Sequence, residues 1–357
     1  MLSQQRIYKI KETQFLGVKN MQQYLSINDI DNIQEAIQSC IEIKQNPHAN
    51  DKLGAHKTLG IIFLNPSLRT KISTIKAAQN IGLNVLPIDV NNGWALEFSE
   101  GVVMNADKPE HIKEAAQVIA SYCDIVAIRS FAKLNDKEQD YQEQIFSAFK
   151  KYTDCPIVNL ESALRHPLQS LADILTIEEY KKPKKLKKPK VVLSWAPHVN
   201  PLPHAVANSF AEGMQLMDYE FVITHPEGYE LDSEFIGDAQ VVYDQDEAFK
   251  DADFIYVKNW SSTKEYGKVI NTDDKWMITQ EKLKNAPNAK VMHCLPVRRN
   301  LVIADDVLDS ECSIVIEQAE NRLYTAQYVL SELVKTLKLQ TSKTPLLNEK
   351  VYADEVE

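Results

Sequence analysis

Glycine is scarce in this chain, with only ten among its 357 residues. No glycine-rich turn follows a predicted strand, which argues against a dinucleotide-binding site. No complete Walker sequence is present, so nucleotide hydrolysis is disfavoured, and no arrangement resembles a Ser–His–Asp triad. The chemistry of the chain must therefore rest on other groups.

Cysteines are also few, and they lie far apart. The five cysteines form no Cys-x-x-Cys pair, so neither a disulfide framework nor a zinc site is indicated; they are Cys40, Cys123, Cys155, Cys294 and Cys312. This pattern fits a reducing cytoplasm. No apolar run approaches the length of a membrane span, and residues 1–6 lack the apolar core of a signal peptide. We expect a cytoplasmic protein with no membrane-spanning segment and no metal.

Positive charge is in deficit, because 40 Lys and Arg face 50 Asp and Glu and the net charge is −10. General affinity for nucleic acid is therefore disfavoured. Residues 181–190 form one basic run, which could bind an anionic surface. Two prolines within it favour the alternative of a solvated loop between domains. An anionic substrate would have to be held by local positive charge.

The chain does have a regular alternation of apolar runs and helical patterns. Candidate strands lie at 58–64, 84–90, 124–131, 156–161, 190–196, 219–225, 253–259, 290–295 and 313–317. This alternation predicts an α/β fold with parallel sheets covered by helices. Several of the strands are continuous apolar runs, as buried parallel strands should be. Two separate sheets are favoured over one sheet of nine strands.

Helical spacing of apolar residues indicates helices at 26–44, 110–122, 138–151, 166–180 and about 321–339. The helix at 166–180 and the basic run after it mark a boundary. The predicted division is a terminal extension at 1–20, a first domain at 21–165, a linking helix and Lys-rich loop at 166–190, a second domain at 191–318, and a last helix and tail at 319–357.

Residues 65–70, with the sequence Asn-Pro-Ser-Leu-Arg-Thr, form the turn between the first predicted strand and a helical pattern. The first N–H groups of a helix have no internal partners and lie at its positive end, so an anion is favoured there. Ser67 and Thr70 could add hydrogen bonds, and Arg69 offers a planar charged fork suited to phosphate. The alternative is an ordinary N-cap serine followed by a surface arginine.

Polar and ionisable residues also follow nearly all of the remaining predicted strands. In chain order they are Trp94, Arg129, Glu161, His166, Gln169, His198, His225, Lys258, His293, Cys294 and Arg298. Ligands of open parallel sheets bind outside the carboxyl ends of the strands, so this set predicts a cleft between two domains. A cationic turn facing donors such as Arg129 and His166 suits group transfer from an acyl phosphate, driven by positioning and electrostatics.

Four motifs, in this order, resemble those of the aspartate/ornithine carbamoyltransferase superfamily: residues 67–70, Arg129, residues 166–169 (His-Pro-Leu-Gln) and residues 293–296 (His-Cys-Leu-Pro). The resemblance covers about residues 22–340. It implies a carbamoyl phosphate domain and an amino-acid domain, with the C-terminal helix packing back on the first. It also implies carbamoyl transfer from carbamoyl phosphate without a cofactor, in arginine biosynthesis, by a homotrimer whose active sites are shared between subunits.

Within the superfamily the chain resembles the branch that uses N-acylated ornithine. This rests on the loop with Trp94 and Glu97 and on residues 107–111 and 295–300. The Asp-x-x-x-Ser-Met-Gly loop expected of plain ornithine enzymes is absent. The succinyl type is favoured, because Pro109 stands where the acetyl type is expected to carry a Glu that would repel a succinyl carboxylate. N-acetylornithine or ornithine as acceptor, and a catalytically silent relative, stay open as alternatives.

Two further positions and one short segment indicate how closely the chain follows the pattern of this branch. Val302 stands where the acetyl type is expected to have Lys, and His198 matches a ligand position of the succinyl type. Residues 105–107 read Asn-Ala-Asp where Asp-Gly-Asp is expected, so the chain departs from the branch pattern in that loop.

The resemblance implies a role for each matching residue. Carbamoyl phosphate would be bound by Ser67, Leu68, Arg69, Thr70, Trp94, Arg129, His166, Gln169, Cys294, Leu295 and Arg322. The acceptor would be bound by Trp94, Pro109, Glu161, His198, Lys258, Cys294, Leu295 and Arg298. Arg129, His166 and Thr70 would polarise the carbamoyl oxygen, and Cys294 would help to place the attacking amine. Covalent catalysis by Cys294 is the rival, disfavoured because direct attack by an amine needs no acyl-enzyme. Trp94 is expected to enter the site of a neighbouring subunit.

Overall fold

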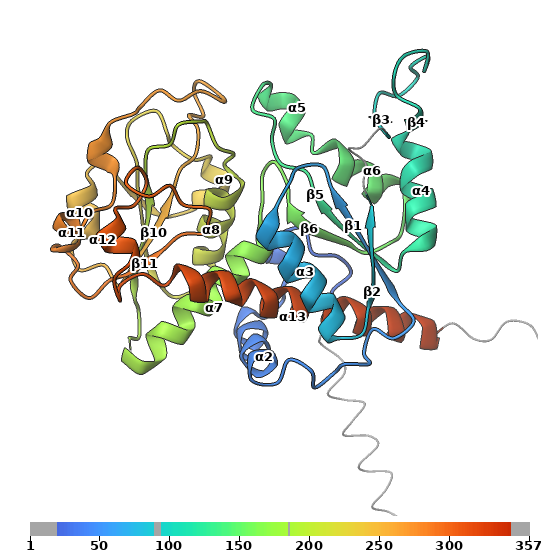
Figure 1. The fold of residues 1–357 in the computed structure, drawn as a ribbon, viewed down its shortest axis with the longest axis horizontal. Coiled ribbons are helices and arrows are strands. Elements are labelled where there is room, and N and C mark those ends of the chain that lie inside the picture. Colours follow the sequence, from blue (N-terminus) through green and yellow to red (C-terminus); the bar gives the residue numbers. More distant parts are fainter. Residues whose placement is uncertain (1–19, 89–93, 185, 344–357) are drawn as a thin grey trace, which may run out of the picture.

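A computed structural model describes residues 20–88, 94–184 and 186–343, with side chains as far as residue 340. Most of the predicted terminal extension and tail lies outside these residues. Two parallel sheets lie side by side (Figure 1). The first has the order β2-β1-β5-β6, with β1 (Thr58–Phe63), β2 (Asn84–Ile88), β5 (Ile125–Arg129) and β6 (Ile157–Glu161). The predicted α/β class with two parallel sheets is confirmed.

The second sheet has five strands in the order β11-β10-β7-β8-β9. They are β7 (Lys190–Trp195), β8 (Glu220–Thr224), β9 (Gln240–Val242), β10 (Phe254–Lys258) and β11 (Lys290–Met292). The sequence analysis missed β9, whose three residues are only partly buried or exposed. A further pair, β3 (Leu96–Glu97) and β4 (Glu110–His111), stands at a tip of the first domain away from the second (Figure 1).

Helices cover the sheets and fill the space between them (Figure 1). Their bounds are η1 (Ile27–Asp29), α2 (Ile33–Gln45), α3 (Leu68–Asn80), α4 (Ile112–Tyr122), α5 (Lys137–Tyr141), α6 (Gln144–Tyr152), α7 (Pro167–Lys184), α8 (Ala205–Gln215), α9 (Ser233–Ile236), α10 (Gln245–Phe249), η2 (Asp274–Trp276), α11 (Gln280–Leu283), α12 (Asp305–Leu308) and α13 (Val315–Lys343). In the described part of the chain, no helix is long and apolar enough to cross a membrane.

The central strands are buried because their residues are almost all apolar. All five residues of β5 are buried, and in β7 only Lys190 is partly exposed. A strand covered by helices on both faces has no polar side to present, so its sequence reads as a continuous apolar run. This is why the positions of these strands could be predicted closely.

Two helices join the domains beneath the sheets. α7 is buried continuously from Pro167 to Glu178, and α13 packs against α2, α3 and α7 (Figure 1). Pro167 occupies the first position of α7, where its missing N–H removes no helical hydrogen bond. The predicted return of the last helix to the first domain is confirmed. The individual domain boundaries stay a prediction.

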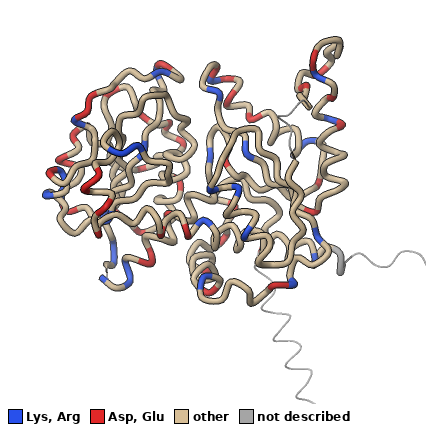
Figure 2. The backbone as a smooth tube through the Cα atoms, viewed as in Figure 1, with Lys and Arg blue, Asp and Glu red and all other residues tan. Residues whose placement is uncertain are grey.

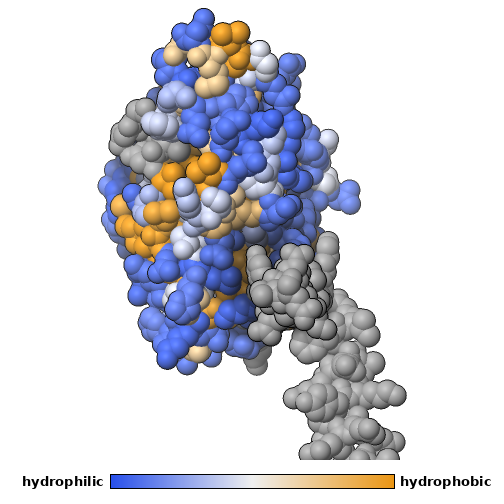
Figure 3. Space-filling model, turned by 90° about the vertical axis from the view of Figure 1, so that its right-hand side faces the viewer, coloured by the Kyte–Doolittle hydropathy of each residue, from blue (hydrophilic) through white to orange (hydrophobic). Residues whose placement is uncertain are grey.

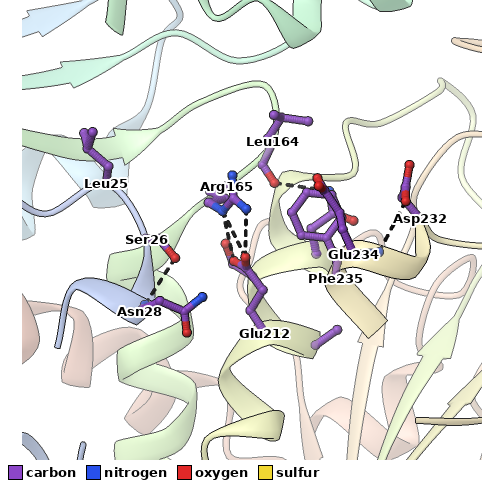
Figure 4. A network of polar contacts seen from close by, with 12 residues as sticks. Leu25, Ser26, Asn28, Leu164, Arg165, Glu212, Asp232, Glu234 and Phe235 are labelled. Carbon is purple, nitrogen blue, oxygen red and sulfur yellow. Dashed lines mark hydrogen bonds and ion pairs between the residues drawn. The ribbon is translucent and has the colours of Figure 1, made fainter. Parts of the chain in front are cut away.

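The turn between β6 and α7 is fastened to the second domain. Arg165 donates from Nε to Glu212 Oε1 at 3.0 Å, and its guanidinium lies 4.9 Å from the Phe235 ring centroid (Figure 4). The Leu164 carbonyl accepts a hydrogen bond from Asn208, and Ser209 Oγ accepts one from the His166 backbone N–H at 2.7 Å. These contacts fix the position of His166 and of the start of α7, which carries Gln169.

The predicted strand at 313–317 is wrong. Ser313 forms a single bridge with Val291, and α13 begins at Val315, before the expected start near residue 321. The β-branched residues there favour a strand locally, but packing under both sheets favours helix and wins over propensity. Similarly, β11 ends at Met292 rather than at residue 295.

Three predictions about where helices begin and end also need correction. The basic run was expected to be a loop, but α7 extends to Lys184 with Pro183 in its last turn. Lysines are favourable at a helix C-terminus, where the dipole is negative. The helix predicted at 138–151 is two helices, α5 and α6, separated at Glu143 by a left-handed backbone (φ +43°). The helix predicted at 26–44 is divided too, because Asn32 caps a separate α2.

Candidate active site

A cleft of about 620 Å³ lies between the two domains at the carboxyl ends of their strands. Its lining comes from both domains and from α13. It consists of Pro66, Ser67, Leu68, Arg69, Thr70, Arg129, Phe131, Glu161, His166, Gln169, His198, Leu202, Pro203, Val206, Lys258, Cys294, Leu295, Pro296, Arg298 and Arg322. Every residue that was given a ligand role, except Trp94 and Pro109, is in this set. His225 and His293, which also follow predicted strands, are buried and do not line the cleft.

The turn after β1 presents the start of α3 to the cleft. Ser67 stands at the N-cap with an extended backbone, but its side chain makes no capping hydrogen bond. The Ser67 hydroxyl therefore does not cap the helix, although serines often do so at this position. The hydroxyl and the first N–H groups of the helix are available to an anion. Arg69 stands beside them at the cleft wall, where burial lowers the pKa of its guanidinium.

Arg129 is held at the end of β5 by several acceptors. Its Nε and Nη2 donate to Glu161 Oε2 at 3.1 and 2.7 Å. Its Nη1 donates to the carbonyls of Asn65 and Pro66 at 2.9 and 2.7 Å. The guanidinium also lies 4.7 Å from the Phe131 ring centroid. A cation fixed in this way needs little rearrangement to stabilise charge that develops nearby.

His166 is a neutral imidazole at the floor of the cleft. Burial lowers the pKa of His166 well below its usual range, and the positive charges of Arg322, Arg129 and Lys258 lower it further. Its Nε2 lies 3.4 Å from Arg322 Nη1 and 3.8 Å from Glu161 Oε2. Its Nδ1 is buried with no hydrogen-bond partner among the described residues. A neutral imidazole can donate a hydrogen bond to a carbonyl oxygen without being consumed as an acid.

Arg322 reaches the cleft from α13 and connects two predicted ligands. Its Nη1 donates to Gln169 Oε1 at 2.6 Å, and its Nη2 donates to Thr70 Oγ1 at 3.2 Å. Burial lowers the pKa of the guanidinium, while the negative charges of Glu161 and Asp173 oppose that effect. The helix that closes the chain therefore supplies a cation to the first domain's anion site.

The segment after β11 forms the opposite wall. The Leu295 backbone N–H donates to His293 Nδ1 at 2.8 Å, and Leu295 has a left-handed backbone (φ +52°). Such a conformation is uncommon for a bulky residue, and it occurs preferentially at functional sites. The pKa of the Cys294 thiol is raised, chiefly by desolvation, so the thiol stays protonated near neutral pH. A protonated thiol is a poor nucleophile, which weighs against covalent catalysis.

The second domain contributes a cationic end to the cleft. Arg298 Nε donates to His198 Nε2 at 3.1 Å, and His198 Nδ1 lies 2.8 Å from the Asn200 carbonyl. Desolvation lowers the pKa of His198, and the charges of Arg298 and Lys258 act in the same direction. Lys258, at the end of β10, lines the same cleft. Together these groups can receive carboxylates.

Two predicted residues do not reach the cleft of their own chain. Trp94 is half exposed and donates from Nε1 to Glu110, at the tip that carries β3 and β4. Pro109 is exposed in the same tip, where Lys108 forms an ion pair with Glu97 at 3.0 Å. Residues 89–93, which include part of the loop before Trp94, lie outside the described residues.

Some residues of the site were missed by the sequence analysis. Phe131, Leu202, Pro203 and Val206 line the cleft, and Asp173 lies buried behind it. Phe131 follows Arg129 by two residues at a strand end, and Asp173 follows Gln169 by one helical turn. That spacing on a helix could have indicated the pairing. Within the described residues, no three His, Cys, Asp or Glu side chains are grouped as a metal site requires.

Both halves of the chain match models of one family of transferases. Residues 22–179 match the carbamoyl-P binding domain of aspartate/ornithine carbamoyltransferases, and residues 203–333 match the Asp/Orn binding domain of the same family. The chain belongs to the aspartate/ornithine carbamoyltransferase family, as the four motifs predicted.

The chain is also similar to individual members of this family. N-succinylornithine carbamoyltransferase of Bacteroides fragilis is 50% identical over 320 residues, which are 89% of this chain and 100% of the relative. N-acetylornithine carbamoyltransferase of Xanthomonas campestris is 32% identical, over 80% of this chain and 90% of the relative. A solved glutamate-to-proline variant of N-acetyl-L-ornithine transcarbamylase, complexed with carbamyl phosphate and N-succinyl-L-norvaline, is 30% identical with a TM-score of 0.80, covering 87% of this chain and 99% of the other.

Proposed function

We propose that this chain transfers the carbamoyl group of carbamoyl phosphate to the δ-amine of N-succinyl-L-ornithine, giving N-succinyl-L-citrulline and phosphate. One observation carries the proposal. A single cleft holds an anion-binding helix start and the cation Arg129 on one side, and a cationic end with Arg298 and Lys258 on the other. A substrate with a phosphate and an acceptor with two carboxylates would each find a complementary wall.

The first wall suits carbamoyl phosphate. Ser67, Arg69 and the N–H groups of α3 would bind the phosphate, with Arg322 reaching it from α13. Thr70, Arg129 and neutral His166 would donate to the carbamoyl oxygen, which becomes negative in the transition state. Gln169 would accept a hydrogen bond from the carbamoyl NH₂, and so would the Leu295 carbonyl.

The reaction needs no covalent intermediate and no cofactor. The neutral δ-amine of the acceptor attacks the carbamoyl carbon, so a C–N bond forms and the C–O bond to phosphate breaks. The departing phosphate takes the proton that the amine loses. The residues of the chain position both reactants and stabilise the oxygen, an effect that can lower the barrier by about 7 kcal/mol or more.

The second wall suits an acyl group that ends in a carboxylate. We infer that Glu161 and Lys258 bind the amino-acid portion, that Arg298 and His198 bind the succinyl carboxylate, and that Cys294 lies against the attacking amine. The relatives support this choice, since the chain is 50% identical to one named for N-succinylornithine. A neighbour in which proline replaces a glutamate was solved with N-succinyl-L-norvaline, and Pro109 would act as that proline does.

We infer that the active protein is a homotrimer, with Trp94 and Pro109 of one subunit completing the cleft of the next. The tip that carries them lies on the side of the first domain away from the second (Figure 1), and neither residue lines the cleft of its own chain. The outer face of the first domain shows hydrophobic patches (Figure 3). The large hydrophobic side chains exposed in this domain include Leu68, Ile72, Leu86, Trp94 and Val103. Exposed apolar surface of this kind marks an interaction site.

We do not assign nucleic-acid binding to the basic run. Lys181 pairs with Glu178 at 2.9 Å, Lys188 lies 3.5 Å from Asp218, and Lys184 donates to the Asn288 carbonyl. Figure 2 shows acidic residues interspersed with Lys and Arg over both domains. A basic stripe along a groove, which nucleic acid would require, is not what this distribution offers.

A panel of acceptors tests the proposal directly. The purified chain is incubated with carbamoyl phosphate and either N-succinylornithine, N-acetylornithine or ornithine, and phosphate release and the ureido product are measured. The largest kcat/KM is expected with N-succinylornithine. Preference for another acceptor would move the assignment to that substrate, and no turnover with any acceptor would indicate a catalytically silent relative. We place the reaction in arginine biosynthesis in the cytoplasm.

A further inference from the structure

Asp173 lies on α7 behind the cleft and is buried between two glutamine side chains. Its Oδ1 accepts from Gln169 Nε2 at 2.7 Å and from Gln318 Nε2 at 2.7 Å. Gln169 precedes it by one turn of α7, whereas Gln318 comes from α13, 145 residues away. The side chains of all three residues are buried. One oxygen therefore receives the NH₂ groups of two amides from two different helices.

A carboxylate oxygen only accepts hydrogen bonds, so it determines which way each amide faces. Gln169 must turn its NH₂ to Asp173 and its Oε1 to the other side, where Oε1 accepts from Arg322 Nη1 at 2.6 Å. Gln318 likewise turns its Oε1 to the backbone N–H of His293 at 2.8 Å. If either amide were reversed, its NH₂ would face a guanidinium or a backbone N–H, and donor would meet donor.

We propose that Asp173 is a positioning residue that makes Gln169 present a hydrogen-bond acceptor to the cleft, and that the site thereby selects an acyl phosphate bearing an NH₂ group. This rests on the proposed function. Acetyl phosphate has the same phosphate and the same carbonyl as carbamoyl phosphate, but it carries CH₃ in place of NH₂. An acceptor fixed toward that group distinguishes the two ligands, whereas an amide free to turn does not.

Asp173 is connected to both walls of the cleft through its two glutamine partners. Through Gln169 it holds Arg322, which donates to Thr70 at the phosphate end. Through Gln318 it holds the His293 backbone, directly before Cys294 and Leu295. Burial raises the pKa of Asp173 to about 7, although its hydrogen bonds and Arg322 oppose that effect. A buried carboxyl that opposes folding at neutral pH is the kind of group found at functional sites.

Two substitutions of Asp173 distinguish the loss of its hydrogen-bond acceptor from a change in the shape of its side chain. Asp173→Asn keeps an oxygen that can occupy the Oδ1 position. Asp173→Leu has the same branching but no acceptor, so the Gln169 amide is no longer held in one orientation. Gln327→Leu is the matched control, because it removes another buried amide of α13, bonded to Asn80 and to the Pro47 carbonyl and not to the cleft, and leaves the bond between Gln169 and Asp173 in place.

Binding of carbamoyl phosphate, acetyl phosphate and inorganic phosphate is measured by calorimetry on the full chain and on the three variants. The unmodified chain is expected to bind carbamoyl phosphate about tenfold or more tightly than acetyl phosphate. Carbamoyl phosphate gains one hydrogen bond to Gln169, whereas the CH₃ group of acetyl phosphate leaves that acceptor unpaired. Asp173→Asn and Gln327→Leu should keep that ratio. Asp173→Leu should reduce that ratio to about threefold or less. A change in phosphate affinity transmitted through Arg322 would affect both acyl phosphates equally and is measured with inorganic phosphate.

Two outcomes would overturn the inference. One is an unmodified chain that binds carbamoyl and acetyl phosphate equally, a result that does not depend on whether any variant folds. The other is a folded Asp173→Leu variant that keeps the full ratio, or a Gln327→Leu variant that loses it. The proposed function has a separate readout, because carbamoyl phosphate binding without transfer to any acceptor would contradict the function and not the role of Asp173.

Discussion

Arg129 and Glu161 form a buried ion pair between the ends of two neighbouring strands, with two guanidinium nitrogens donating to one carboxylate oxygen at 3.1 and 2.7 Å. Both Nη1 donors are also occupied, by backbone carbonyls of the turn before α3. A guanidinium has five N–H donors. One Nη2 N–H therefore has no hydrogen-bond partner among the described residues, and the pair aims that donor from a fixed position.

Replacement of Arg129 by Ala should lower kcat by about 100-fold or more, because removing one preorganised donor to a developing oxyanion has an effect of that size. The KM for the acceptor should change much less, since the acceptor is bound mainly by the other domain. Steady-state kinetics with both substrates varied separates the two effects. Turnover retained near the original rate would contradict the role assigned to Arg129.

Asp173 should make the stability of the protein depend on pH. The pKa of its carboxyl is raised to about 7 in the folded chain, against about 3.9 when unfolded. Between these values the folded state holds more protons, so this group's contribution to stability is present at low pH and lost as pH rises to about 7. Asp173→Asn removes the dependence.

Urea unfolding of both proteins at pH 5 and pH 8 measures the effect. From pH 5 to pH 8 the free energy of unfolding of Asp173→Asn should rise relative to the unmodified chain by about 2.7 kcal/mol, which is 1.36 kcal/mol for each of the two pH units between pH 5 and the folded pKa near 7. His166 and His293, whose pKa values are lowered by burial, contribute equally to both proteins and cancel in the difference. Parallel stability curves would contradict the expectation.

Neighbouring arginines offer a matched pair for the acceptor site. Arg298 lines the cleft and donates to His198, while Arg299 is exposed and bound to Asp305 and Asp309. Arg298→Ala should raise the KM for N-succinylornithine by about tenfold or more, which is the range of a charge-assisted hydrogen bond. Arg299→Ala should leave both KM values unchanged. Equal effects of the two substitutions would remove Arg298 from the acceptor site.

The parts of this fold that could be predicted depend on residues close together in the sequence. β5 is a run of buried apolar residues, and the turn at 65–70 joins a strand to a helix within six residues. Both are local patterns that burial or helix-end chemistry dictates. The positions of Arg129 and His166 in one cleft followed from the rule that parallel strands present their carboxyl ends together.

The rest depends on contacts that only the folded chain creates. The pairing of Asp173 with Gln318 joins residues 145 positions apart, and no local pattern indicates it. The early start of α13 at Val315 arises because tertiary packing overrides the strand propensity of β-branched residues. The extension of α7 to Lys184 depends in the same way on the surroundings of the helix end, where Lys184 donates to the Asn288 carbonyl.

Pro109 should control the choice between acyl groups. Pro109→Glu would place a carboxylate near the succinyl carboxylate, so the ratio of kcat/KM for N-succinylornithine to that for N-acetylornithine should fall by about tenfold or more. Pro109→Ala serves as the control, since it removes the ring without adding charge and should keep the succinyl preference. A Pro109→Glu variant with an unchanged ratio would place the selectivity elsewhere, for example at His198 and Arg298.

Sharing of the cleft between subunits can be tested by mixing two inactive variants. Trp94→Ala should lower activity although Trp94 does not line the cleft of its own chain. Arg129→Ala inactivates the cleft of its own chain. In a mixed trimer, a cleft with intact Arg129 from one subunit and intact Trp94 from its neighbour is complete. Mixed and reassembled subunits should therefore recover activity that neither variant has, and sedimentation should give the mass of three chains. Mixtures as inactive as their components would show that each cleft is completed within one chain.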